Sequence, residues 1–171
     1  MYSKNRWLRH LYSALSLSLA VIQTPAYGRG LEIGALKVPD GFQLHLLTDA
    51  VPGARSLAVD DEGTVYVGSL DEGKVYAVPT KEGQATAVRT VLKGLDHPNG
   101  VAVLNHALYI AEVSRIIKVP LPIPKDKGGV HPEVIYSDLP TDPHHGWRYL
   151  RATPDGALLI AIGQPCNICN L

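Results

Sequence analysis

The chain has 171 residues, enough for one domain, and its 16 lysines and arginines balance 16 aspartates and glutamates. This balance argues against a nucleic-acid-binding protein, because such proteins carry a clustered basic face. The hydrophobic fraction of 46% argues against disorder, and the 16 glycines and 13 prolines are spread along the chain, which indicates many turns between short elements.

The first 28 residues have the layout of a secretory signal peptide. Lys4, Arg6 and Arg9 precede a short, mostly apolar run at 11–22, and small residues suited to cleavage follow it. A buried amphipathic helix is the alternative, but no stripe of period 3.6 is evident. The run is too short for the roughly 20 residues of a membrane-spanning helix. We therefore expect export to the periplasm or medium, no stable membrane span, and a mature chain over 29–171.

Beyond the signal peptide the chain shows no strong helical pattern, and a strand–turn–strand phrase recurs instead. Gly41–Leu47 predicts a lone strand ahead of the first copy. That copy, 54–78, contains an inner strand, a turn at 60–63, the alternating strand 64–69, a second turn at 71–73 and a last strand. Asp and Glu ahead of Gly supply the backbone freedom that tight hairpins need.

Two more copies follow. The second, 99–120, predicts strands on both sides of a turn at 104–107, and the third, 147–163, has its turn at 153–156. A loop is expected between them, over 120–129. Equivalent strand positions in the three copies are 43 and 50 residues apart, close to the roughly 40–50-residue period of propeller blades.

The predicted fold class is all-β: a partial β-propeller with about three blades of a probable six-bladed ring. A β-sandwich is the alternative, because it also contains regular short strands. Propellers close with about 4–8 blades, so three blades leave two open sheet edges. We therefore expect 29–171 to be the N-terminal part of a truncated propeller domain, with a chain that closes its ring by oligomerising as the alternative.

Two adjacent histidines, His144 and His145, precede the third copy. On an extended strand they point to opposite faces, so one is expected to face the propeller axis and the other a neighbour or solvent. Histidine is the usual general base near neutral pH. Two loop histidines without a function are the alternative.

The two cysteines, Cys166 and Cys169, form a C-x-x-C pair. Asn170 stands where covalent haem attachment requires a histidine, which excludes a c-type haem site. A disulfide is the simplest prediction for an exported chain. Zinc bound by both cysteines and His144 or His145 is the alternative.

Two further features have structural explanations. His97-Pro98-Asn99-Gly100 is strong turn chemistry. Glu112 and Arg115 follow a predicted strand, and we expect them to be surface charges at its end.

Over residues 36–171 the chain resembles the soluble sorbosone and glucose dehydrogenases that use pyrroloquinoline quinone (PQQ). The phrases that carry the resemblance are, in order, GFQLHLL, ARSLAVDDEGTVYVGS with GKVYAV, LDHPNGVAVLNHALYIAEV and LPTDPHHGWRYLRATPDGALLIAIGQPCNIC. The most specific pieces are HHGWRYL with the following PDG, and IGQPCNIC. Pro98 stands where the glucose-specific members have glutamine, which favours the sorbosone type.

The resemblance implies a six-bladed propeller with the quinone over its central opening. It assigns the base to His145, nine residues before Pro154, and cofactor contacts to His144, Arg148 and Asn99. Hydride passes from a sugar or sugar-derived alcohol or aldehyde to PQQ, and calcium polarises a quinone carbonyl. Most calcium ligands and the quinone's cationic partners are expected outside this chain, and an external electron acceptor completes turnover.

Two other functions stay open. A calcium-dependent, lactonase-like propeller hydrolase would use Asn99 and Asn167 as candidate ligands. A non-catalytic propeller remnant would bind without turnover, and the chain itself is expected to be inactive if half the ring is missing.

Overall fold

The structure, a computed structural model, describes residues 33–124, 130–164, 166 and 167, so the predicted signal peptide lies outside the described residues. The chain divides into two compact units, 1–42 and 43–171. The described part of the first contains a short 3-10 helix, Ile33–Ala35, and the second contains all the strands of the described residues. No helix in the described ranges has the length and apolar character needed to cross a membrane.

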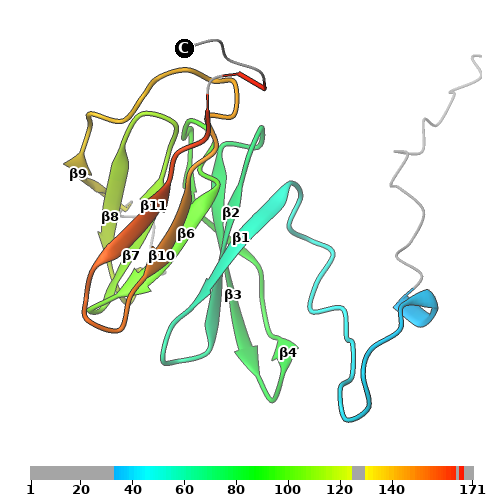
Figure 1. Cartoon of the computed structure of the whole chain (residues 1–171). Coiled ribbons are helices and arrows are strands. Elements are labelled where there is room, and N and C mark those ends of the chain that lie inside the picture. The colour runs from blue at the N-terminus through cyan, green and yellow to red at the C-terminus, as the bar shows by residue number, and fades with distance from the viewer. Residues whose placement is uncertain (1–32, 125–129, 165, 168–171) are drawn as a thin grey trace, which may run out of the picture. The chain divides into compact units, whose positions relative to one another are not determined.

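The first sheet is antiparallel and has the strand order β1-β2-β3-β4, with β5 also paired to β3 (Figure 1). Its strands are β1 (Ala54–Val59), β2 (Thr64–Ser69), β3 (Lys74–Lys81), β4 (Gln84–Ala85) and β5 (Arg89–Lys93). The three strands predicted for the first copy are confirmed. The strands β4 and β5 were not predicted, because the polar residues at 80–84 interrupt the alternating pattern.

The second sheet is a four-stranded antiparallel meander, and a separate hairpin follows it. The sheet consists of β6 (Gly100–Leu104), β7 (Ala107–Ala111), β8 (Ile116–Pro120) and β9 (Glu133–Tyr136), and the hairpin of β10 (Tyr149–Ala152) and β11 (Leu158–Ala161). The predicted turns between these strands are confirmed. Of the three expected blades, the described residues thus contain two full sheets and a third that is a two-stranded hairpin.

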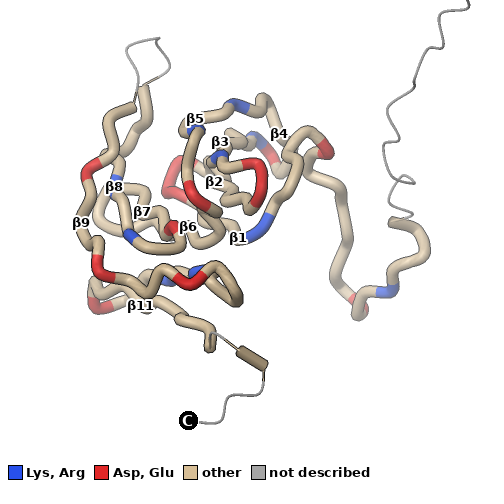
Figure 2. The backbone as a smooth tube through the Cα atoms, turned by 90° about the horizontal axis from the view of Figure 1, so that it is seen from above, with Lys and Arg blue, Asp and Glu red and all other residues tan. Residues whose placement is uncertain are grey.

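The sheets lie beside one another, and the first strands of successive copies are neighbours (Figure 2). An apolar core, including Tyr66, Val75, Leu108 and Ile117, fills the space between the first two sheets. A second core, including Ile116 and Leu150, joins the second sheet to the hairpin. This serial packing is the propeller-like arrangement and not that of a two-layer sandwich. The described residues show no closed ring.

The prediction of a lone strand at Gly41–Leu47 was wrong, because no residue in this range forms a strand. The alternating apolar residues Leu44 and Leu46 stay exposed. Leu47 alone packs against the small core of the first sheet, next to Val67. An alternating pattern produces a strand only where a partner edge accepts its hydrogen bonds, and none of the described strands pairs with this segment.

The inner strands approach so closely that two positions require glycine. A Cβ atom at Gly68, on β2, would lie 2.5 Å from the carbonyl oxygens of Pro98 and Asn99. One at Gly100, on β6, would collide with the carbonyl oxygen of Arg148 and lie 2.8 Å from the nitrogen of Leu150. The backbone before β10 is therefore pressed directly against β6.

Substituting Gly100 with alanine should destabilise the domain, since the added methyl meets rigid backbone. We expect Gly100→Ala to lower the free energy of unfolding by about 1–3 kcal/mol, the usual cost of overpacking. Urea denaturation measures the change. Gly34→Ala is the matched control, because a Cβ there meets nothing within 4 Å. Equal stability of the two variants would contradict the close packing.

Candidate functional site

The segment that leads into β10 turns sharply at the two histidines. The backbone nitrogen of His144 donates to the Asp142 carboxylate at 2.8 Å, and that of Gly146 donates to the Pro143 carbonyl at 3.1 Å. His145 adopts φ of 52°, in the left-handed region that non-glycine residues rarely enter. A side chain held in such a conformation is a candidate for function.

The two histidines do not point to opposite faces, so that prediction was wrong. Their ring centroids lie 4.1 Å apart with the planes inclined by 33°. The alternation rule applies to an extended strand, whereas His144 and His145 sit in a turn. The turn therefore brings the two imidazoles together.

His145 makes a hydrogen bond that determines its tautomer. Its Nδ1 lies 2.9 Å from the carbonyl oxygen of Gln164, beyond β11. A carbonyl oxygen can only accept, so Nδ1 carries the proton. In the neutral ring the lone pair is then on Nε2, to which no described residue donates a hydrogen bond. Gly163 allows this contact, because a Cβ there would lie 2.5 Å from the His145 carbonyl oxygen.

Arg148 is buried with 1% of its surface exposed, although it carries a charge. Its Nε donates to the Val113 carbonyl at 2.9 Å, and its Nη2 to the Pro140 carbonyl at 2.6 Å. No carboxylate of the described residues forms an ion pair with it. Burial lowers the pKa of the guanidinium, because the low-dielectric interior disfavours the charged form. A buried cation held only by carbonyls keeps its charge available to an anionic ligand.

Asn99 is fully buried and joins three segments of the chain. Its Nδ2 donates to the Arg148 carbonyl at 3.0 Å, its Oδ1 accepts from Arg55 Nε at 3.3 Å, and its own carbonyl accepts from the Ser56 hydroxyl. The predicted turn is present in a tight form, with the Asn99 nitrogen bonded to the His97 carbonyl at 2.6 Å. The structure therefore places Asn99 inside the fold, and its cofactor contact stays a prediction.

Glu112 was expected at the surface, and that prediction was wrong: 1% of it is exposed. Its carboxylate accepts from the Asp96 backbone nitrogen at 2.7 Å and pairs with Arg115, whose pKa rises through this hydrogen bond. The Glu112 carboxylate is buried because it accepts a hydrogen bond from the backbone of Asp96. This contact joins distant parts of the chain, so the local sequence pattern does not predict it. It holds the loop before β6 to the end of β7.

A cavity of about 580 Å³ adjoins the histidine turn, within the usual size range of small-molecule sites. It is lined by Pro140, Thr141, Asp142, His144, Arg148, Ile162, Gly163 and Gln164. It combines a histidine, the buried guanidinium and a glutamine, the kinds of group that bind a carboxylate-bearing, polar ligand. The donor set therefore fits a quinone with carboxylates such as PQQ.

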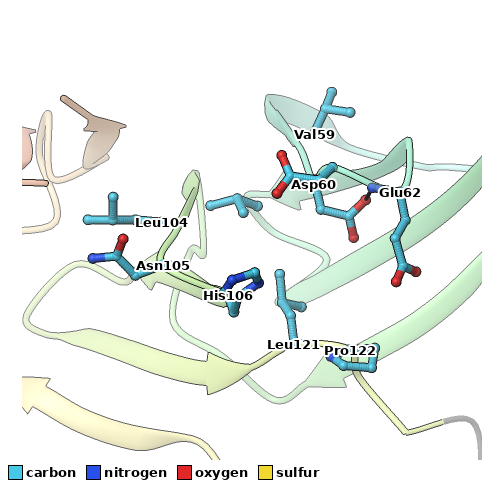
Figure 3. Close-up of a pocket in the computed structure, with 10 residues that line it drawn as sticks. Val59, Asp60, Glu62, Leu104, Asn105, His106, Leu121 and Pro122 are labelled. Atoms are coloured by element: carbon cyan, nitrogen blue, oxygen red, sulfur yellow. Dashed lines mark hydrogen bonds between the residues drawn. The ribbon is translucent and has the colours of Figure 1, made fainter. Parts of the chain in front are cut away.

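A second cavity, of about 450 Å³, lies where the turn after β1 meets the turn between β6 and β7 (Figure 3). One of its carboxylates, that of Asp60, accepts hydrogen bonds from the backbone nitrogens of Glu62 and Thr64 and from the Tyr66 hydroxyl. Burial, and then this bond to Asp60, raises the pKa of Tyr66. Asp60 thus serves the hairpin and is not free for a ligand.

The predicted metal ligands and the predicted disulfide are the remaining features of the site. Among the described residues no group of three or more His, Cys, Asp or Glu side chains could hold a metal ion. Cys169 lies outside the described residues, and its disulfide with Cys166 stays a prediction.

Solved structures with a similar fold exist. The iodide and calcium structures of a Trichoderma reesei enzyme of carbohydrate-active enzyme family AA12 are 22% and 21% identical to this chain, each with a TM-score of 0.60, covering 75% of this chain and 34% of that one. The PQQ-bound aldose sugar dehydrogenase from Streptomyces coelicolor is 18% identical with a TM-score of 0.50, covering 67% of this chain and 39% of that one.

The chain therefore shares its all-β fold with part of each of these structures. The chain spans about a third of the length of these neighbours. No protein-family model matches the chain, and no curated protein matches it.

Replacing the buried guanidinium should be costly, because two carbonyl groups lose their donors. We expect Arg148→Met to lower the free energy of unfolding by about 2–4 kcal/mol, the cost of leaving buried acceptors unpaired. Arg151→Met, at an exposed position of β10 three residues further along the chain, is the matched control and should change stability by less than about 0.5 kcal/mol. Chemical denaturation measures both, and a mild effect of Arg148→Met would refute its bridging role.

Proposed function

We propose that this chain is part of a PQQ-dependent oxidoreductase that oxidises a sugar or a sugar-derived alcohol or aldehyde, with His145 as the general base. The observation that carries the proposal is the bond from His145 Nδ1 to the Gln164 carbonyl. It leaves the unprotonated Nε2 free to accept the proton of a substrate hydroxyl. The likeness of the fold to a PQQ-bound sugar dehydrogenase supports the same assignment.

Each residue around His145 has its own role in the proposed reaction. His144, stacked beside it, positions the imidazole and borders the cavity together with Arg148. The buried Arg148 guanidinium supplies positive charge toward a carboxylate of the cofactor. PQQ, when bound, supplies the two-electron acceptor for the substrate hydride. Gln164 keeps the His145 proton on Nδ1, so the base stays in the productive tautomer.

The finer assignments belong to the same proposal. Pro98 favours the sorbosone type over glucose specificity, and further blades would complete a six-bladed ring and contribute calcium ligands. Residues 1–28 would direct export to the periplasm or medium, where an external electron acceptor reoxidises the cofactor. Neither the lactonase-like hydrolase nor the non-catalytic remnant is favoured by a specific observation on the described residues.

Removal of the base should abolish most turnover while leaving the fold intact. In the complete gene product loaded with PQQ and calcium, we expect His145→Gln to lower the rate of sugar-dependent dye reduction by about 100- to 10,000-fold, the usual contribution of a general base. His131→Gln, an exposed histidine in the second sheet's connection, is the matched control and should keep the wild-type rate.

Two results would reject the proposal. One is a wild-type protein that binds no PQQ and reduces no dye with any sugar. The other is near-equal turnover by wild type and His145→Gln, which would remove His145 from the chemistry even if the quinone is used.

A further inference from the structure

An arginine and a tryptophan from two different sheets form an exposed pair beside the candidate site. Arg55 lies on β1 and Trp147 just before β10, and the Arg55 guanidinium carbon is 5.3 Å from the centroid of the indole. This is a cation–π contact, which orients the planar guanidinium relative to the ring. No role was predicted for either residue from the sequence, although Trp147 lies within the phrase HHGWRYL.

The guanidinium is held from a second side by Asn99. Arg55 Nε donates to Asn99 Oδ1 at 3.3 Å, and the amide is itself fixed by full burial and by its bond to the Arg148 carbonyl. With Nε occupied, the two terminal nitrogens of Arg55 are the edge left for a ligand. Among the described residues no carboxylate forms an ion pair with Arg55.

Arg55 is thus an oriented guanidinium that no carboxylate of the described residues neutralises. An arginine fork binds a carboxylate through two parallel hydrogen bonds, and it does so best when its orientation is already fixed. Trp147 is 44% exposed, so part of its indole is available to the apolar face of a ring. The combination suits a ligand that carries a carboxylate on a ring.

The position of the pair separates it from the proposed cofactor cavity. Arg55 and Trp147 do not line the cavity bordered by His144 and Arg148. Trp147 follows His145 by two residues, a chain length that spans at most about 7 Å. A ring resting on the indole is therefore within reach of the base.

We propose that Arg55 and Trp147 form a subsite for the carboxylate and ring of an acidic sugar, such as a uronate, which makes sugar acids the substrate class. The proposal rests on the proposed function, since it names the substrate of that site. A carboxylate of the quinone is the other source of the same chemistry. The cavity lined by Arg148 is the place for that group, so we assign the Arg55 subsite to the substrate.

Direct binding to the full chain tests the subsite without turnover. Ligand-observed NMR titrations would compare D-galacturonate, D-galactose and PQQ on the wild type, Arg55→Gln, Arg55→Lys and the control Arg151→Gln, with thermal melts confirming that each variant folds. We expect galacturonate to bind the wild type at least about tenfold more tightly than galactose, as a charge-assisted pair predicts. Arg55→Gln should abolish that preference, Arg55→Lys should weaken it because the fork is lost, and Arg151→Gln should retain it.

Three outcomes overturn the subsite. The wild type shows no preference for galacturonate; the preference survives in Arg55→Gln; or Arg55→Gln weakens PQQ and leaves the sugar acid unaffected, which assigns Arg55 to the cofactor. Failure of the proposed function looks different. If the chain binds galacturonate through Arg55 but never reduces dye with PQQ, the subsite proposal stands and the proposed oxidoreductase function is rejected.

Discussion

The candidate site depends on one buried joint, the hydrogen bond from the Asn99 side chain to the Arg148 backbone. It ties the start of β6 to the segment before β10, and the missing Cβ at Gly100 lets the two backbones meet. The Asn99 side chain also accepts a hydrogen bond from Arg55 on β1. The joint therefore connects the beginnings of all three copies of the repeated phrase. A buried amide left without partners would cost free energy, so the three segments are held in one arrangement.

The chemistry of the turn follows from that arrangement. With the backbone at Arg148 fixed, the short stretch before it closes into a turn that stacks two imidazoles and places one against the Gln164 carbonyl. The side chain of Arg148 donates hydrogen bonds to the carbonyl oxygens of Pro140 and Val113. One segment thus contains an imidazole of defined tautomer and a buried cation. This pairing suits proton removal from a hydroxyl next to an anionic cofactor.

The sequence predicted most of the strands and few of the contacts. Alternating runs beside Asp/Glu-Gly turns mark β1, β2 and β3, and a turn at Asn105-His106 marks the β6–β7 hairpin, because both pattern and turn chemistry are local. The outer strand β5, the burial of Glu112 and the stacking of the histidines depend on partners far along the chain. The resemblance singled out His145 and Arg148, whereas Arg55 acquires its position only through Asn99 and Trp147.

The tautomer of His145 tests the account most directly, since both the base and its orientation depend on it. Long-range ¹H–¹⁵N correlation spectra of the histidine rings, assigned by comparison with His145→Gln, distinguish a protonated Nδ1 from a protonated Nε2. The account predicts that neutral His145 carries its proton on Nδ1 and that Nε2 has the chemical shift of an unprotonated nitrogen. A neutral ring protonated on Nε2 would contradict it, because the Gln164 carbonyl would then face an unprotonated Nδ1, and Nε2 would have no lone pair to accept the substrate proton.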